Sequence, residues 1–228
     1  MGFDNGKMSC RGAMFSLDIV FCIDMSANIS IANDVKNTLC RIRNEYLEEK
    51  IAEGNVLRVR FVLFRDYRYP NQCPMEESRF FTLDDELDEA VAFLDGKYGE
   101  GGGDAPENAL EALALAMRSD WWTEAAVRRH VILLFTDAAP HPLGALSDCE
   151  GYPPGMPSSF DELHTLWEKK MPKKGSRLLV FAPDVEPWSN MYDWTNTFFS
   201  AVEEQGNCVE FSGEDGIEVC YRIIENSI

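Results

Sequence analysis

The stretch "FSLDIVFCIDMSANIS", residues Phe15 to Ser30, decides the fold. Its first nine residues are mostly apolar, and a run of this kind is typical of a strand that is covered on both faces of a parallel sheet. The run ends in an acid, a hydroxyl and an amide, Asp24, Ser26 and Asn28, each separated by one residue. These side chains either cap the next helix or present hard oxygen ligands to one divalent cation.

Three more apolar runs follow, at Leu57–Phe64, His130–Phe135 and Arg177–Ala182. Between them lie helical patterns, with apolar stripes over Ile31–Tyr46 and Leu110–Met117 and weaker patterns at Asp84–Asp95, Ser159–Lys169, Met191–Glu203 and Ile217–Ile224. Alternating strands and helices predict an α/β fold: one doubly wound, mostly parallel open sheet of about six strands, Rossmann-like, with helices on both faces.

The edges of this sheet and one long loop also leave a signal in the sequence. Ser78–Leu83 is separated from the second strand by "DYRYPNQCP", which is too short for a helical crossover, so an antiparallel edge strand is expected there. The run "CVEF", Cys208–Phe211, is a second candidate edge. Ala138–Ser159 contains five prolines and is expected to be an elaborated loop.

Length and composition limit the classes of function that the chain could have. The 228 residues are 45% hydrophobic and 26% charged, and they fit one soluble domain spanning residues 1–228. No run approaches the ~20 apolar residues of a membrane span, and no secretory signal is visible, so a cytoplasmic protein is expected. The formal net charge of −18 makes nucleic acid and anionic membranes unsuitable partners. Seven cysteines without a pairing pattern fit a reducing compartment.

Open α/β sheets bind ligands at the carboxyl ends of their strands, and three loops rich in oxygen donors are expected there. Their candidate ligands are Asp24, Ser26 and Asn28 after the first strand, Asp104 and Glu107 in "GGGDAPE", and Asp137 in "LLFTDAAPH". If the first and the later strand are neighbours, the loops converge. Carboxylates and hydroxyls are suited to Mg²⁺ or Mn²⁺.

These segments resemble a known family. "LDIVFCIDMSANI" resembles the first-strand signature of von Willebrand factor type A domains, in which an apolar strand runs into D-x-S-x-S. "LLFTDAAPH" resembles the family's later strand with its metal-associated aspartate, and "GGGDAPENALEALALAM" is similar to the D-x-P-E loop and helix of integrin β-subunit relatives and of some bacterial members. The resemblance spans roughly Phe15 to Pro142, and Asn28 stands where the family has its second serine.

The resemblance implies a metal-ion-dependent adhesion site formed by the three loops. In that site the cation, Mg²⁺ or Mn²⁺, keeps one coordination position for an acidic side chain of a partner protein, so the function is binding rather than catalysis. "FAPDVEPWS", Phe181 to Ser189, resembles stand-alone bacterial type A domains linked to stress-response and phosphorylation systems. The oligomeric state has no signal in the sequence.

Other interpretations stay open at this stage. Asp104 and Glu107 form a D-x-x-E pattern, so Glu107 either ligates the cation or only closes a capping box at a helix start. Asp24 after a strand also allows a magnesium-dependent phosphohydrolase with Asp24 as nucleophile, although the place two residues on, which holds an acid in D-x-D phosphotransferases, is occupied by Ser26. A type A scaffold with a degenerate metal site is a third alternative. His141, four residues after Asp137 and between two prolines, either borders the site or lies on the surface of its loop, and the surface position is expected.

Overall fold

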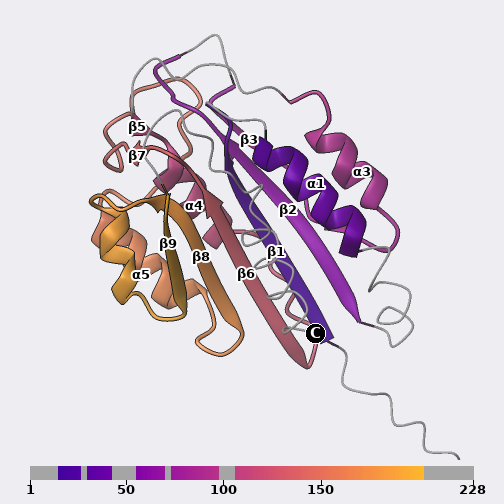
Figure 1. The fold of residues 1–228 in the computed structure, drawn as a ribbon. Helices are drawn as coiled ribbons and strands as arrows, with labels where there is room; N and C mark the ends of the chain where they lie inside the picture. Colours follow the sequence, from indigo (N-terminus) through magenta and orange to yellow (C-terminus); the bar gives the residue numbers. More distant parts are fainter. Residues whose placement is uncertain (1–14, 27–29, 43–54, 70–72, 98–105, 203–228) are drawn as a thin grey trace, which may run out of the picture.

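The computed structural model describes residues 15–26, 30–42, 55–69, 73–97 and 106–202. These ranges contain a seven-stranded sheet with helices on both faces (Figure 1). The elements are β1 (Phe15–Asp24), α1 (Ser30–Ile42), β2 (Val56–Phe64), β3 (Met75–Glu77), β4 (Phe81–Thr82), α3 (Leu87–Leu94), β5 (Pro106–Glu107), α4 (Ala109–Met117), β6 (Val127–Phe135), β7 (Ala139–Pro140), α5 (Phe160–Lys170), β8 (Ser176–Pro183), the 3-10 helix η2 (Trp188–Asp193) and β9 (Thr197–Val202).

The sheet is mostly parallel. Strands β2, β1, β6, β8 and β9 lie side by side in that order and are all parallel, and β3 and β4 both pair antiparallel with β2. The predicted α/β class, with its mostly parallel open sheet and antiparallel edge, is therefore confirmed. β5 and β7 form a separate two-stranded parallel pair at the end of the sheet where the parallel strands finish (Figure 1).

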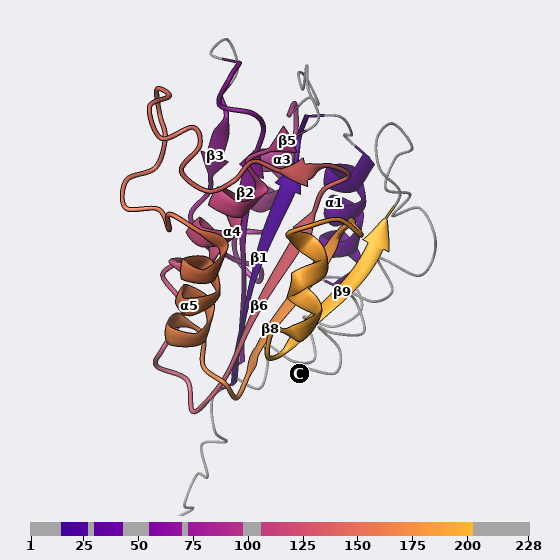
Figure 2. The same cartoon turned by 90° about the vertical axis from the view of Figure 1, so that its left-hand side faces the viewer.

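The central strand β1 packs against helices on both of its faces. Alternate residues point to opposite faces of a strand, and every residue of β1 after Phe15 is buried. Leu17, Ile19 and Phe21 join the apolar cluster that includes residues of α1 and α3, whereas Val20 and Cys22 join the cluster that includes α4 and α5. The two layers of helices on either side of the sheet can be followed in Figure 2. The near-continuous apolar run seen in the sequence is explained by this double burial.

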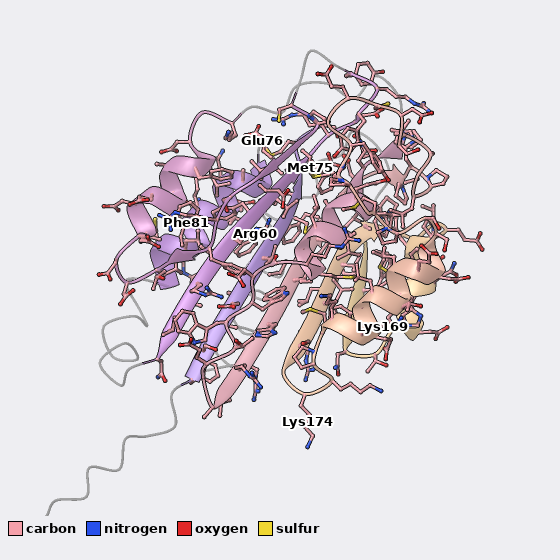
Figure 3. The ribbon with its side chains drawn as sticks, turned by 180° about the vertical axis from the view of Figure 1, so that it is seen from behind. Arg60, Met75, Glu76, Phe81, Lys169 and Lys174 are labelled. Atoms are coloured by element: carbon pink, nitrogen blue, oxygen red, sulfur yellow. The ribbon has the colours of Figure 1, made fainter. Side chains whose placement is uncertain are left out.

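The antiparallel edge is divided by Ser78. The backbone N–H of Phe61 donates to Oγ of Ser78 at 2.8 Å instead of to a backbone carbonyl, while the N–H of Ser78 donates to the carbonyl of Phe61 at 2.9 Å. This local replacement of a ladder hydrogen bond separates β3 from β4. In Figure 3, Met75 lies toward one end of this edge and Phe81 lies further along it, beside a helix.

One predicted helix is wrong. The segment Met191–Glu203 was expected to be helical, but η2 ends at Asp193 and β9 follows from Thr197 to Val202. The run "TFFSAV" is rich in β-branched and aromatic residues, and its backbone groups pair with β8 instead of with one another. The expected edge Cys208–Phe211 and the expected helix Ile217–Ile224 lie outside the described residues.

The remaining predicted elements are present in shorter or shifted form. The helix expected over Asp84–Asp95 is α3, and the one expected over Ser159–Lys169 is α5, which is capped by Ser159: its Oγ accepts a hydrogen bond from the N–H of Glu162 at 3.2 Å. Residues 141–159 contain no helix or strand, as expected for the elaborated loop. Over the described ranges, none of the helices combines the length and the apolarity that crossing a bilayer requires.

Candidate functional site

The first and third predicted loops meet because β1 and β6 are neighbours. Ile23 of β1 lies opposite Phe135 of β6, so the next residues along the two strands, Asp24 and Thr136, also lie side by side. The N–H of Met25 donates to the carbonyl of Phe64 at 2.9 Å, which continues the pairing with β2 beyond the end of β1. Asp24 therefore lies between two strand ends at the carboxyl edge of the sheet.

Both carboxylate oxygens of Asp24 accept hydrogen bonds from hydroxyl groups. Oδ1 accepts from Oγ of Ser26 at 2.5 Å and from the N–H of Ser26 at 2.9 Å, and Oδ2 accepts from Oγ1 of Thr136 at 2.6 Å. Oγ1 of Thr136 accepts in turn from the N–H of Ala138 at 3.2 Å. Asp24 lies six residues before the start of α1.

The carboxylate of Asp24 is a destabilised anion. The pKa of this carboxyl is raised from 3.8 to about 6, because burial and, to a smaller extent, the nearby Asp137 outweigh the hydrogen bonds from Ser26 and Thr136, which lower it. Asp24 and Asp137 are both buried, with 5% and 8% of their surfaces exposed. The loops after β1 and β6 thus bring Asp137 close enough to Asp24 to disfavour the charge of Asp24.

Glu107 of the second loop is positioned by the third loop. It lies in β5, where it pairs with Pro140 of β7, and its carbonyl accepts a hydrogen bond from the N–H of His141 at 2.9 Å. Glu107 is 2% exposed. Helix α4 begins at Ala109 with Asn108 as its N-cap residue, so Glu107 precedes the helix and the capping-box interpretation is wrong.

The six predicted ligands divide into two groups. The structure brings Asp24, Ser26 and Asp137 together. It places Glu107 in β5, which pairs with β7, and β7 begins two residues after Asp137. Asn28 and Asp104 lie outside the described residues.

The contacts of three further polar residues at this edge were not predicted from the sequence. Thr136 directly precedes a predicted ligand, but its contact with Asp24 depends on which strands are adjacent. His141 is 2% exposed, which corrects the expectation of a surface position, and its Nε2 lies 3.4 Å from Oδ1 of Asp66. Asp66, 1% exposed, follows β2 in "DYRYPNQCP", a segment that we considered only as a connection too short for a helical crossover. An acid just after a predicted central strand was the available signal.

The opposite end of β1 holds a second buried polar cluster, around Asp18. Arg58 donates to both of its carboxylate oxygens, from Nε at 2.8 Å and from Nη2 at 2.5 Å, and the N–H of Trp122 donates to Oδ2 at 2.7 Å. The guanidinium also lies over the ring of Phe80, 4.3 Å from its centroid. All of Asp18 is buried. Because Arg58 and Trp122 donate hydrogen bonds to both carboxylate oxygens, the role of Asp18 is structural: it attaches the segment around Trp122 to the sheet.

The donors at the carboxyl edge are of the kind that a hard divalent cation prefers. Asp24 and Asp137 offer carboxylates and Ser26 offers a hydroxyl, whereas softer metals favour thiolate ligands. Over the described ranges, no three His, Cys, Asp or Glu side chains are grouped so that they could hold a metal ion. A cation at this edge would therefore depend on hydroxyl and amide oxygens, or on residues beyond those ranges, in addition to one or two carboxylates.

Comparisons with known proteins give a likeness of fold. No family model matches the sequence, and no curated protein matches it. The pilus adhesin SpaC from Lactobacillus rhamnosus GG is similar at a TM-score of 0.60 and 12% identity, over 94% of this chain and 31% of that chain. Its open conformation gives 0.58 and 12%, over 94% and 30%. BatB, a conserved hypothetical protein from Bacteroides thetaiotaomicron, gives 0.46 and 14%, over 93% and 98%.

The chain spans about a third of the length of the pilus adhesin. At 12% identity the likeness concerns the fold alone. It is consistent, at a coarse level, with a von Willebrand factor type A-like architecture.

Proposed function

We propose that this protein binds a divalent cation, Mg²⁺ or Mn²⁺, at the carboxyl edge of its sheet and uses the cation to hold an acidic side chain of a partner protein. The proposed ligands are Asp24, Ser26 and Asn28 of the first loop, Glu107 or Asp104 of the second, and Asp137 of the third. A bound cation would supply positive charge beside the oxygen donors of these loops.

The observation that carries the proposal is the environment of Asp24. Its carboxylate is buried next to Asp137, and its pKa is raised to about 6, so near neutral pH the folded chain holds a charge that its surroundings disfavour. Two hydroxyl groups fix the orientation of both of its oxygens. A buried anion that is held in place but not neutralised is what a cation site requires before the cation binds.

The choice of an acidic partner group follows from charge. A divalent cation that meets one or two carboxylates directly keeps an attraction for another anion, and hard cations prefer oxygen ligands. The chain carries a net charge of −18, so long-range forces repel an acidic partner. The contact is therefore expected to form at short range, within the ~8 Å over which physiological salt leaves charges unscreened.

The fold likeness supports an adhesive rather than a catalytic role. SpaC is named a pilus adhesin, and this chain resembles about a third of that protein in fold, at a TM-score of 0.60. A cytoplasmic setting in a bacterial stress-response or phosphorylation-linked system is the part of the proposal that rests only on "FAPDVEPWS" and on composition.

Isothermal titration calorimetry with MgCl₂ and MnCl₂ tests cation binding. The unsubstituted protein is expected to release or absorb heat with one-to-one stoichiometry, and Asp24→Ala and Asp137→Ala to lose the signal. Ser159→Ala, at the cap of α5, is the matched control and is expected to bind normally. Absence of binding by the unsubstituted protein would refute the proposal. Hydrolysis of a generic phosphate ester that depends on Asp24 would favour the phosphohydrolase instead.

A further inference from the structure

Helix α4 carries one acidic side chain among buried apolar ones. All of its residues except Leu115 are buried, and Glu111 is 1% exposed. Oε1 of Glu111 accepts a hydrogen bond from the hydroxyl of Tyr152 at 2.9 Å, and its Oε2 meets no donor among the residues that the structure describes. A carboxyl that is buried with one oxygen unpaired costs free energy, so apolar packing alone does not explain a glutamate at this position.

Tyr152 belongs to the elaborated loop, residues 141–159, and attaches it to α4. Its hydroxyl donates to Glu111 and accepts a hydrogen bond from the N–H of Gly144 at 3.1 Å, so one hydroxyl joins two parts of the loop to the helix. The ring of Tyr152 lies 5.3 Å from the ring of Tyr67, between their centroids. Tyr67 is 4% exposed whereas Tyr152 is half-buried, so Tyr152 is the member of this cluster that lies nearest to solvent.

A second side chain of α4 reaches the same loop. The guanidinium of Arg118, at the end of the helix, donates to the carbonyls of Pro154 and Gly155. The two attachments differ in chemistry, because Arg118 stays charged at every pH at which the protein folds, whereas a carboxyl gains or loses a proton. Of the two, only Glu111 can make the attachment of the loop depend on pH.

The surroundings of Glu111 favour its neutral form. Burial raises the pKa of this carboxyl above its ordinary value of 4.5, although the hydrogen bond from Tyr152 lowers it. Glu111 lies in the first turn of α4, where the helix dipole alone would stabilise the anion, so burial outweighs this effect. The titratable groups that face the cluster are Tyr67, Cys73, Glu77 and Tyr152. None of these groups carries a positive charge that would neutralise the anion.

We propose that Glu111 makes the attachment of the elaborated loop to α4 depend on a proton: the loop is held closed while Glu111 is protonated and opens more readily once Glu111 is an anion. Opening the loop brings water to the carboxyl, so the open form binds the proton less tightly than the closed form does. The contribution of the protonated carboxyl to closure is complete below pH 4.5 and is lost as the pH rises through the raised pKa. The proposal does not rest on the cation site.

Hydrogen–deuterium exchange of backbone amides over residues 142–158, measured in EDTA, tests this proposal. Glu111→Gln keeps an oxygen that accepts from Tyr152 but cannot ionise. At pH 8.0, where the unsubstituted protein has lost the proton, the loop of the variant is expected to exchange at least about threefold more slowly. At pH 4.0 the two proteins are expected to differ by less than about twofold, because both side chains are then neutral.

Two matched variants act as controls. Glu150→Gln makes the same chemical change at an exposed acid of the same loop and is expected to leave exchange unaltered at both pH values. Arg118→Ala removes the attachment whose charge is constant, so it is expected to speed exchange of the loop by the same factor at pH 4.0 and pH 8.0.

The unsubstituted protein gives a test that needs no variant to fold. The protection of its loop amides, corrected for intrinsic exchange and compared with that of α5, is expected to fall between pH 4.0 and pH 8.0. Constant protection of the loop over this range would overturn the proposal. Identical exchange of Glu111→Gln and the unsubstituted protein at pH 8.0 would overturn it as well. Equal slowing by Glu111→Gln at both pH values would do the same, because it would show an effect on packing rather than on ionisation.

Discussion

Replacing Asp24 with Asn is expected to remove a pH-dependent penalty from the metal-free protein. The pKa of Asp24 is about 6 in the folded chain and 3.8 ordinarily, so the folded state binds the proton more tightly than the unfolded state does. The stability that this carboxyl contributes is complete below pH 3.8 and is lost as the pH rises through about 6. The gap between the two values corresponds to ~3 kcal/mol.

Urea unfolding of both proteins, in the presence of EDTA, measures this penalty. The free energy of unfolding of Asp24→Asn minus that of the unsubstituted protein is expected to increase by ~3 kcal/mol between pH 3.5 and pH 7.5. Any constant offset from the altered hydrogen bonds to Ser26 and Thr136 cancels in this change, as do other titrating groups. A difference that stays flat over this range would refute the assigned environment of Asp24.

The same pair of proteins also reports on the cation. At pH 7.5, Mn²⁺ at 100 times its dissociation constant is expected to stabilise the unsubstituted protein by ~2.7 kcal/mol and the Asn variant not at all. Equal stabilisation of both proteins would place the cation elsewhere.

Three further predictions concern the fold. Arg58→Ala leaves the carboxylate of Asp18 buried without its partner, so urea unfolding is expected to show a loss of ~3–5 kcal/mol, and a loss below ~1 kcal/mol would contradict the role of the pair. Gly175 has a φ of +98°, and a Cβ at this position would lie only 2.4 Å from the carbonyl oxygen of Arg128. Gly175→Ala is therefore expected to lower the melting temperature, and an unchanged melting temperature would contradict this close approach. Burial lowers the pKa of His130, so the stability that its neutral ring contributes is complete above pH 6.5 and is lost as the pH falls through the lowered value. His130→Gln is expected to lose less stability in acid than the unsubstituted protein does. Identical pH profiles of the two proteins would contradict this role of His130.

The sequence was sufficient for the central strands because of how they are buried. β1, β2, β6 and β8 are enclosed by helices or neighbouring strands, and burial on both faces demands apolar residues at almost every position. β9 was missed because it lies at the margin of the sheet, where exposed and buried residues mix and the alternation is weak. Its state is decided by pairing with β8, a contact that no local pattern encodes.

The candidate site was predictable to the extent that it depends on strand ends. Asp24 and Asp137 each follow an apolar run, and adjacency of β1 and β6 is enough to bring them together. The contacts of Thr136, Asp66 and His141 could not be predicted because they depend on strand register and on the path of loops over the sheet edge. The position of Glu107 depends on a two-residue strand, too short to leave a periodic signal.

The central claim is that Asp24, Ser26 and Asp137 share one divalent cation, and a crystal grown with MnCl₂ tests it most directly. Data collected near the manganese absorption edge should give an anomalous peak among the side-chain oxygens of these three residues. The claim would be contradicted if these side chains were well defined in the electron density and no anomalous peak lay among them, at a manganese concentration high enough to saturate the site.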